Sequence, residues 1–177
     1  MMEIRKAVPS DLEQIEFLYN NLCDYLEMNQ NYPGWKKGVY PVREDAENGL
    51  REECLFVVQK KNMIIGTFML RHKPEDGYKN AVWLTENDYS RIYVVYTLAV
   101  HPNYLQHGVG MQILKYVDNF ARKEHCISIR LDVVKGNIPA ERLYQKNGYK
   151  LINTVSLGYE EYGLPWYNLY EKVLQNG

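Results

Sequence analysis

Residues 97–111 read TLAVHPNYLQHGVGM, where an apolar strand gives way to a glycine-bearing loop and then to a helix. Upstream, residues 91–100 are almost continuously β-branched, aromatic or apolar, which is typical of a strand covered on both faces. His101 and Pro102 end this strand, because proline lacks a backbone donor and restricts the residue before it. From Gly110 onward apolar residues recur at helical spacing, which predicts a helix that packs against the sheet.

Two glycines, Gly108 and Gly110, stand at the mouth of this helix. A helix N-terminus presents backbone N–H groups without partners and the positive end of the helix dipole, so it can hold a phosphate. Without side chains at these two positions, a diphosphate can approach the backbone closely. A plain glycine turn is the simpler interpretation of an isolated Gly-x-Gly, but the order strand, loop, helix favours the phosphate site. The loop therefore predicts a phosphorylated cofactor.

Composition narrows the class of protein. The chain has 177 residues, of which 46% are hydrophobic and 24% charged, and its formal net charge is −1. These values are ordinary for a globular protein, so we expect a single domain over residues 1–177. The small charge argues against nucleic acid or an anionic membrane as a partner. We find no membrane-spanning run, signal-peptide pattern or metal-ligand spacing of cysteines, so we expect a cytoplasmic location and no metal.

The hydrophobic pattern alternates between strands and helices. Strands are expected at residues 3–7, 54–59, 63–71, 91–100, 127–133, 151–157 and 167–173, with a weak strand at 81–85. Helices are expected after residue 10, at 42–50, from 110 and at 139–146. Ser10 and Glu13 have the spacing of a capping box at the start of the first helix. This order predicts an α/β fold in which helices cover a mixed sheet.

A second informative segment, residues 137–149, reads NIPAERLYQKNGY. Asn137 is a favourable helix N-cap, and Gly148 is typical of the residue that follows a helix. Between them, Tyr144 shares a helix face with apolar residues and is expected to point inward. On spacing alone, Tyr144 is more simply a core residue with its hydroxyl at the rim than a functional group.

Together the two segments resemble the GNAT superfamily of N-acetyltransferases. Residues 98–111 resemble the family's acetyl-CoA pyrophosphate loop, and residues 137–149 resemble its Asn-x-x-Ala-x-x-Leu-Tyr-x-x-x-Gly-Phe/Tyr segment. The resemblance implies a GNAT-like fold, with a central, mostly antiparallel mixed sheet of about six or seven strands, splayed at the central strand and flanked by about four helices. It also implies an enzyme that transfers acetyl from acetyl-CoA to a primary amine of a small molecule or, less readily, of a peptide or protein.

The resemblance also implies roles for individual residues. Strand backbone would pair with the pantetheine arm, loop amides would hold the pyrophosphate, and an asparagine would contact the cofactor arm. These residues are Leu98, Ala99 and Val100, then Gln106, His107, Gly108, Val109, Gly110 and Met111, and finally Asn137. Tyr144 would lie near the thioester sulfur as the general acid that protonates the leaving thiolate. Leu105 replaces the Gln or Arg usual in the family, so we expect cofactor binding that is weaker or slightly reshaped but not lost.

The acceptor site is expected where the loop over residues 29–41, the end of the central strand and the C-terminal hairpin meet. Its candidate substrate-binding residues are the aromatic side chains Trp35, Tyr40, Tyr96 and Tyr159. An aromatic wall suits an amine on an apolar body, although rings that simply pack the loops are an equal alternative. No general base can be assigned, because Glu86 and Asp88 near the central strand are more simply solvated loop acids.

Two classes of function remain open from the sequence. One is the acetyltransferase, with acetyl-CoA and a small-molecule amine as partners, no nucleic acid and no membrane, and with homodimer formation left open. The other is a non-catalytic acyl-CoA-binding module that kept the fold and lost turnover, since a fold does not guarantee chemistry. A dinucleotide-binding fold is a weaker interpretation, because its Gly-x-Gly-x-x-Gly pattern is absent in the required context.

Overall fold

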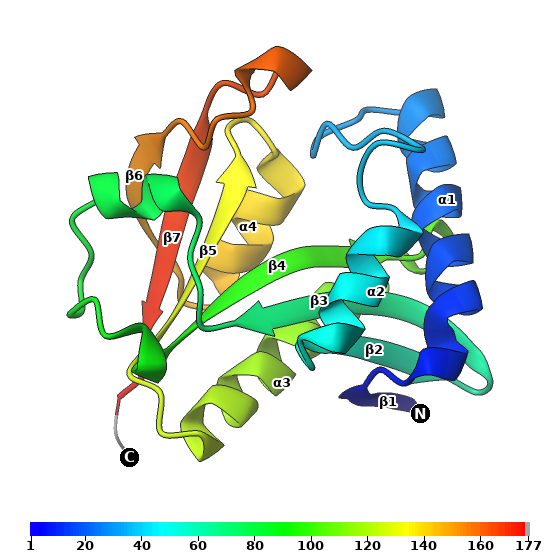
Figure 1. Cartoon of the computed structure of the whole chain (residues 1–177), viewed down its shortest axis with the longest axis horizontal. Coiled ribbons are helices and arrows are strands. Elements are labelled where there is room, and N and C mark those ends of the chain that lie inside the picture. Colours follow the sequence, from blue (N-terminus) through cyan, green and yellow to red (C-terminus); the bar gives the residue numbers. More distant parts are fainter. Residues whose placement is uncertain (176–177) are drawn as a thin grey trace. The chain divides into compact units, whose positions relative to one another are not determined.

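A computed structural model describes residues 1–175 (Figure 1). The strands are β1 (Met2–Lys6), β2 (Leu55–Lys60), β3 (Met63–Arg71), β4 (Ile92–Val100), β5 (Ser128–Val134), β6 (Lys150–Val155) and β7 (Tyr167–Val173). The α-helices are α1 (Leu12–Met28), α2 (Arg43–Arg51), α3 (Val109–Lys123) and α4 (Ile138–Lys146). Within the described residues the strands form one seven-stranded sheet in the order β1-β2-β3-β4-β5-β7-β6, which confirms the predicted mixed α/β fold. No helix in this part of the chain has the length and apolarity needed to cross a bilayer.

Backbone contacts divide the chain into two compact units. The first unit holds residues 1–31, 35–70 and 96–113, and the second holds residues 32–34, 71–95 and 114 onward. Both β4 and α3 contribute residues to each unit, because the chain passes from one to the other within these elements. The single domain expected from composition stays a prediction.

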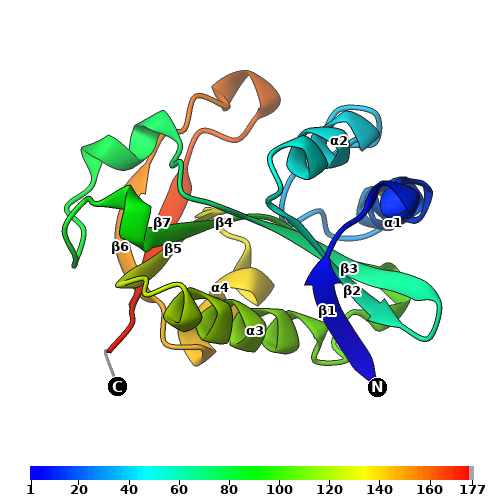
Figure 2. The same cartoon turned by 60° about the horizontal axis from the view of Figure 1, so that its bottom comes forward.

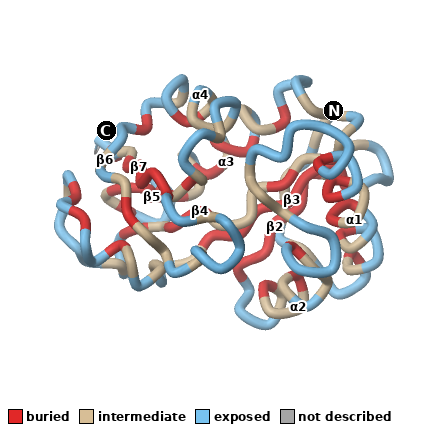
Figure 3. The backbone as a smooth tube through the Cα atoms, turned by 90° about the horizontal axis from the view of Figure 1, so that it is seen from above, coloured by how far each residue is buried: buried red, intermediate tan, exposed pale blue. Residues whose placement is uncertain are grey.

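In the first unit, α1 and α2 pack on one face of the antiparallel strands β1, β2 and β3 (Figure 2). Apolar residues of α1 recur at three- and four-residue spacing, so they form one stripe that faces the sheet. The core contains Ile15, Leu18 and Leu22 of α1, Ala46 of α2, Leu55 and Val57 of β2, and Ile64 and Met69 of β3. Figure 3 shows β2 and β3 buried along most of their length, which is why their sequences are continuously apolar.

The start of α1 differs from the prediction that Ser10 caps the helix. A 3-10 turn, Pro9–Asp11, leads into α1, and Asp11 accepts a hydrogen bond from the Val8 N–H at 2.8 Å. Arg5 donates to both carboxylate oxygens of Asp11, at 2.7 and 3.0 Å, and thereby holds the pKa of that carboxyl below its ordinary value. Asp11, and not Ser10, therefore makes the side-chain hydrogen bonds at this end of the helix.

The second unit is built around β5 and β7. These strands pair antiparallel along the full length of β5, and β7 pairs antiparallel with β6. The first part of β4 pairs with β5 in parallel, and this ladder ends at the pair Val95–Leu131. Beyond it, β5 continues to Val134 with ladder partners on β7 alone. A parallel ladder that stops halfway along β5 agrees with the predicted splay.

The two faces of β7 contact different elements. Tyr170 donates a hydrogen bond to Glu141 of α4 at 2.7 Å, so its side of the strand faces that helix. The next residue, Glu171, accepts a hydrogen bond from the Leu84 N–H at 2.6 Å. Because side chains alternate along a strand, α4 and the segment that precedes β4 cover opposite faces of the sheet in this unit.

The weak strand expected at residues 81–85 is wrong. Short 3-10 turns, Asp76–Asn80 and Tyr89–Arg91, bracket irregular chain in this segment. Its backbone groups bind buried side chains instead of a neighbouring strand: the Thr85 C=O accepts from Arg130 at 3.1 Å. Irregular backbone is stable when its polar groups are satisfied in this way.

Candidate active site

The loop between β4 and α3 ends in a group of unused backbone donors. The first hydrogen bond of α3 runs from the Gln112 N–H to the Gly108 C=O at 3.1 Å, so the preceding amides lie outside the helical ladder. Within the described residues, four consecutive amides here donate no hydrogen bond: those of Gly108, Val109, Gly110 and Met111. Gln106 and Gly108 have positive φ angles of 61° and 77°, a feature of backbone turns that gather N–H groups around an anion.

The same loop is open enough for a phosphate group. Gln106, His107 and Gly108 are exposed, whereas Val109 is 2% exposed and anchors the start of the helix. A β-carbon added at Gly108 would meet no atom within 4 Å. A diphosphate could therefore reach the loop and accept hydrogen bonds from its backbone N–H groups. The positive end of the fifteen-residue helix would stabilise its negative charge.

Strand β4 carries backbone strain just before this loop. Thr97 has a φ of 48°, which is sterically costly for a β-branched residue, and its hydroxyl forms a short hydrogen bond with the Tyr40 hydroxyl. After it, Ala99 is buried in the core of the first unit, while Leu98 and Val100 remain partly exposed. Strained backbone of this kind occurs where the surrounding structure holds it for function, which marks this part of β4 as a candidate binding edge.

Three of the four aromatic candidates lie in the first unit. The rings of Trp35 and Tyr40 meet edge to face with centroids 5.8 Å apart. Trp35 and Tyr96 are partly buried against the core of this unit, so both have a packing role. Tyr40 is 37% exposed, a larger fraction than Trp35 or Tyr96.

Helix α4 begins and ends as predicted. Asn137 caps its N-terminus, because the side-chain oxygen accepts a hydrogen bond from the Ala140 N–H at 3.4 Å. Gly148 follows the helix with a φ of 87°, a conformation that favours glycine. The nine-residue helix that carries Tyr144 is therefore bounded at both ends by local sequence signals.

Tyr144 is 8% exposed, which confirms that it points inward. Its ring packs beside Tyr149 and Tyr170, with centroids 6.0 and 6.2 Å away. Its hydroxyl makes no hydrogen bond with the described residues, and the hydroxyl oxygen remains slightly accessible to solvent. Burial raises the pKa of Tyr144 above its ordinary value, and the nearby charge of Asp132 raises it further. The phenol is therefore protonated at neutral pH and can donate a proton.

One acid, Asp132, lies at a position that the sequence did not single out. It is the first residue of β5 beyond the end of the parallel ladder with β4. Its Oδ2 accepts a hydrogen bond from the buried Tyr78 hydroxyl at 2.6 Å. Burial raises the pKa of Asp132 to about 6, with a smaller contribution from Glu75 against the opposing effect of the Tyr78 hydrogen bond. The feature of the sequence that could have identified Asp132 is that it is a lone acidic residue in a strand that is otherwise mostly apolar.

Tyr159, the fourth aromatic candidate, lies in the second unit. Its hydroxyl donates to Glu75 Oε1 at 3.3 Å, and its ring centroid is 5.8 Å from that of Tyr167. Burial raises the pKa of Tyr159 to about 12, and the charges of Glu75 and Asp132 contribute in the same direction. Burial also raises the pKa of Tyr167, with Asp132 as the next largest cause. The carboxylates of Asp132 and Glu75 therefore lie close to the protonated phenols of Tyr159 and Tyr167.

The loop acids considered as bases lie in different surroundings. Glu86 is exposed, and its carboxylate lies 3.6 Å from the Arg91 guanidinium. Asp88 is exposed as well, and it accepts hydrogen bonds from the Ser90 N–H and hydroxyl at 3.2 and 2.6 Å. Both contacts agree with the interpretation of these residues as solvated loop acids.

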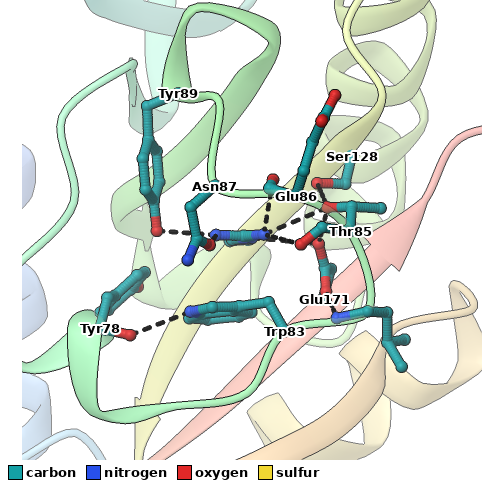
Figure 4. Close-up of polar contacts among 10 residues, drawn as sticks. Tyr78, Trp83, Thr85, Glu86, Asn87, Tyr89, Ser128 and Glu171 are labelled. Atoms are coloured by element: carbon teal, nitrogen blue, oxygen red, sulfur yellow. Dashed lines mark hydrogen bonds and ion pairs between the residues drawn. The ribbon is translucent and has the colours of Figure 1, made fainter.

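A buried ion pair between Arg130 and Glu171 organises the chain that precedes β4 (Figure 4). Arg130 lies two residues before Asp132 in β5, so the two side chains share a face of the sheet. Arg130 and Glu171 are each fully buried, and the Arg130 Nε donates to Glu171 at 3.0 Å. The guanidinium also stacks on the Trp83 ring at 4.2 Å. Its remaining hydrogen-bond partners are Thr85, Glu86, Asn87 and Tyr89. These contacts fix residues 85–89 against the sheet, and Tyr78 lies in the 3-10 turn that precedes them.

Comparison with known proteins shows a family that matches most of the chain. The profile of the Acetyltransferase (GNAT) family matches residues 16–149. Among solved structures, a GNAT-family acetyltransferase of Streptococcus agalactiae 2603 is 19% identical, with a TM-score of 0.81 over 99% of this chain and 96% of that chain.

Two further structures are similar over the whole length. The yncA protein of Salmonella typhimurium, solved with its cofactor acetyl-CoA, is 15% identical with a TM-score of 0.70 and covers 100% of this chain and 96% of its own. An N-acetyltransferase of Escherichia coli named for an alanine of a ribosomal protein is 14% identical with a TM-score of 0.71 and the same two coverages. At these identities the likeness shows the fold, and the profile match shows the family.

Proposed function

Because the chain belongs to the GNAT family of acetyltransferases, whose co-substrate is acetyl-CoA, we propose that it acetylates the primary amine of a small molecule. In this proposal both substrates bind together, and the amine nitrogen attacks the thioester carbonyl carbon directly. Most of the acceleration comes from holding the two reactants in contact. The observation that carries the proposal is Tyr144, a nearly buried phenol whose hydroxyl has no hydrogen-bond partner in the described chain.

The cofactor lies along β4 and the start of α3 in this proposal. The unused amides of residues 108–111, with the exposed Gln106 and His107, hold the pyrophosphate. Backbone groups of Leu98, Ala99 and Val100 bind the pantetheine arm in the manner of an added strand. The side-chain oxygen of Asn137 is used in capping α4, so its amide NH₂ is the group that contacts the cofactor arm.

Tyr144 acts as the general acid. The phenol is protonated at neutral pH, so its hydroxyl can hydrogen-bond to the leaving sulfur and donate its proton as negative charge develops there. A group that already donated to a protein acceptor would have to break that bond first. The absence of such an acceptor among the described residues is therefore favourable for catalysis.

The aromatic side chains Trp35, Tyr40 and Tyr96 of the first unit and Tyr159 of the second are the candidate acceptor-binding residues. Ring faces suit an amine with an apolar body or a cationic group. The Escherichia coli neighbour is named for a protein acceptor, so peptide amines belong in any test of specificity.

The experiment measures CoA release from acetyl-CoA with a panel of arylalkylamines, polyamines, amino acids and short peptides, together with acetyl-CoA binding by calorimetry. We expect acetyl-CoA to bind to the protein, and CoA to be released only with a subset of the small primary amines. Turnover restricted to peptides would replace the small-molecule proposal with a peptide acceptor. Binding without turnover on any amine would favour the non-catalytic acyl-CoA module.

A further inference from the structure

We propose that Asp132 and Glu75, ringed by Tyr78, Tyr159 and Tyr167, form the subsite for the acceptor amine, and that Asp132 takes the first proton from the bound ammonium. The inference rests on the proposed function and adds two things to it. It names the missing base, and it restricts the acceptor to a primary amine without a negative charge on the neighbouring carbon.

The position of Asp132 in the sheet is the first argument. The ladder between β4 and β5 ends at the pair Val95–Leu131, and Asp132 follows immediately. The β5 residues 128–131 each pair with a residue of β4, but Asp132 does not. The strand edge beside Asp132 is therefore available to a ligand. On α4, Tyr144 lies near enough for the Asp132 charge to raise the pKa of its hydroxyl. Asp132 and α4 lie on opposite faces of the sheet, so the acid and the proposed proton donor would approach a ligand at this strand edge from opposite sides.

The hydrogen bonding of Asp132 is the second argument. Tyr78, which is 1% exposed, donates to Oδ2 at 2.6 Å and fixes the orientation of the carboxylate. Within the described residues, Oδ1 accepts no hydrogen bond. A carboxylate with one oxygen held and the other oxygen unused can accept a proton from a ligand without losing its orientation. Its pKa of about 6 leaves it ionised at neutral pH and close to the range that suits a general base.

The charge of the surroundings is the third argument. The groups coupled to Asp132 are the carboxylate of Glu75 and the phenols of Tyr78, Tyr144, Tyr159 and Tyr167. The nearest cation along β5, Arg130, is neutralised by Glu171 on the same face. The subsite is therefore negative and lined by rings.

Two of these phenols are themselves nine-tenths buried without a hydrogen-bond partner. Tyr144 is 8% exposed and Tyr167 is 9% exposed, and neither hydroxyl bonds to a residue of the described chain. Buried hydroxyls normally have a partner, so these two are available to a polar ligand. An ammonium with its attached carbon body satisfies both the carboxylates and the ring faces.

The same charges restrict the acceptor. A carboxylate on the carbon that bears the amine would lie within a few ångströms of Asp132 or Glu75, and like charges at such distances repel. An alkyl or arylalkyl amine, or an amine whose neighbouring carboxyl is converted to an amide, avoids this repulsion. We therefore expect discrimination against free α-amino acids.

The proton transfers balance as follows. The acceptor enters as an ammonium and gives one proton to Asp132, which frees the nitrogen lone pair to bond to the thioester carbonyl carbon. The carbon–sulfur bond breaks, its electrons go to sulfur, and sulfur takes the proton of Tyr144. The second nitrogen proton leaves as the amide forms and restores the phenol through solvent. Asp132 releases its proton to solvent, so one proton is produced for each acetyl group transferred.

The acceptor class is tested with matched compounds: 2-phenylethylamine, phenylalaninamide and phenylalanine, which share one ring and differ at the neighbouring carbon. We expect kcat/KM for phenylalanine to be lower than for 2-phenylethylamine by roughly tenfold or more, with phenylalaninamide much nearer to the amine. Equal values for the amine and the amino acid would overturn the charge argument.

The role of Asp132 is tested with Asp132→Asn, which keeps the shape of the side chain. We expect kcat to fall by roughly 100-fold or more, and the acidic limb of the pH–rate profile, at about pH 6 in the parent, to disappear. Rates with a primary amine that is already neutral at the assay pH, such as 2,2,2-trifluoroethylamine, should fall much less. Retention of the limb and of the rate would exclude Asp132 as the base.

Tyr78→Phe supplies a readout that a purely structural role would not give. The Tyr78 hydrogen bond lowers the pKa of Asp132, so its loss should raise that pKa and move the acidic limb to higher pH. Glu86→Gln, at an exposed acid outside the subsite, is the matched control and should leave the profile unchanged. An unmoved limb in Tyr78→Phe would contradict the assignment of the limb to Asp132.

Calorimetric binding of 2-phenylethylamine in the presence of CoA separates this inference from the proposed function. Binding that Asp132→Asn weakens, in a protein that turns over no amine, would keep the subsite and refute the proposed function. Turnover in the parent protein with amine binding unaffected by Asp132→Asn or by Glu75→Gln would keep the proposed function and refute the subsite.

Discussion

Tyr144 combines burial with an unused hydroxyl, and this combination can be tested at a single atom. We expect Tyr144→Phe to lower kcat by roughly 100-fold while the Kd for acetyl-CoA changes little, because the phenol donates its proton only as sulfur becomes negative. Stability should be nearly unchanged, since no hydrogen bond to a described residue is lost. Stopped-flow CoA release and calorimetry measure the two quantities.

The control for this variant is Tyr149→Phe. Tyr149 is 3% exposed, its ring lies 6.0 Å from that of Tyr144, and its hydroxyl is also buried without a partner in the described chain. Removal of this hydroxyl should leave kcat unchanged. An equal loss of rate in both variants would mean that the tyrosines support packing and not chemistry.

Gly108 permits a prediction about the cofactor loop. Gly108→Ala has room for its β-carbon but must adopt a φ of 77°, so we expect a loss of stability of about 1 kcal/mol and a modest change in acetyl-CoA affinity. Gly108→Glu adds a negative charge beside the unused amides, which should weaken binding by roughly tenfold or more. Equal affinity of the two variants for acetyl-CoA would remove this loop from the pyrophosphate site.

At the scale of elements, α4 is a short helix held by its caps, and its orientation sets the position of Tyr144. The hydrogen bond from the Ala140 N–H to the Asn137 side chain satisfies one of the donors that the helix leaves unused. Asn137→Ala should therefore cost about 1 kcal/mol of unfolding free energy, measured by urea titration.

Asn137→Asp separates the cap from the cofactor contact. Aspartate is an equally good N-cap, so stability should return to nearly the parent value. The side-chain NH₂ that we assign to the cofactor arm is absent in this variant, so the Kd for acetyl-CoA should rise. A normal Kd in Asn137→Asp would assign Asn137 to the cap alone.

For the molecule as a whole, the buried pair of Arg130 and Glu171 is the contact whose loss should cost the most stability. Both side chains are fully buried, so removal of one partner leaves an uncompensated charge. We expect Arg130→Met to lower the free energy of unfolding by about 3–5 kcal/mol. Arg43→Met is the matched control, because Arg43 is 40% exposed in its ion pair with Glu16 and should contribute less than about 1 kcal/mol.

Prediction from sequence succeeded where the deciding interactions are local. The strand β4, the glycine loop, α3 and the capped helix α4 follow from signals within a few residues of each other, such as the unused amides of a helix start and the Asn137 cap. Because these signals also form the family's cofactor and tyrosine segments, they were enough to identify the fold and the acetyl-CoA chemistry.

Features that join distant parts of the chain could not be found in this way. Asp132 meets Tyr78 across 54 positions, and Arg130 meets Glu171 across 41, so neither pairing leaves a pattern in its own segment. The irregular chain at residues 81–85 likewise depends on a buried arginine from another element. Periodicity and capping report the neighbours of a residue along the chain, whereas the charge and burial of a site depend on its neighbours in space, and only folding brings those together.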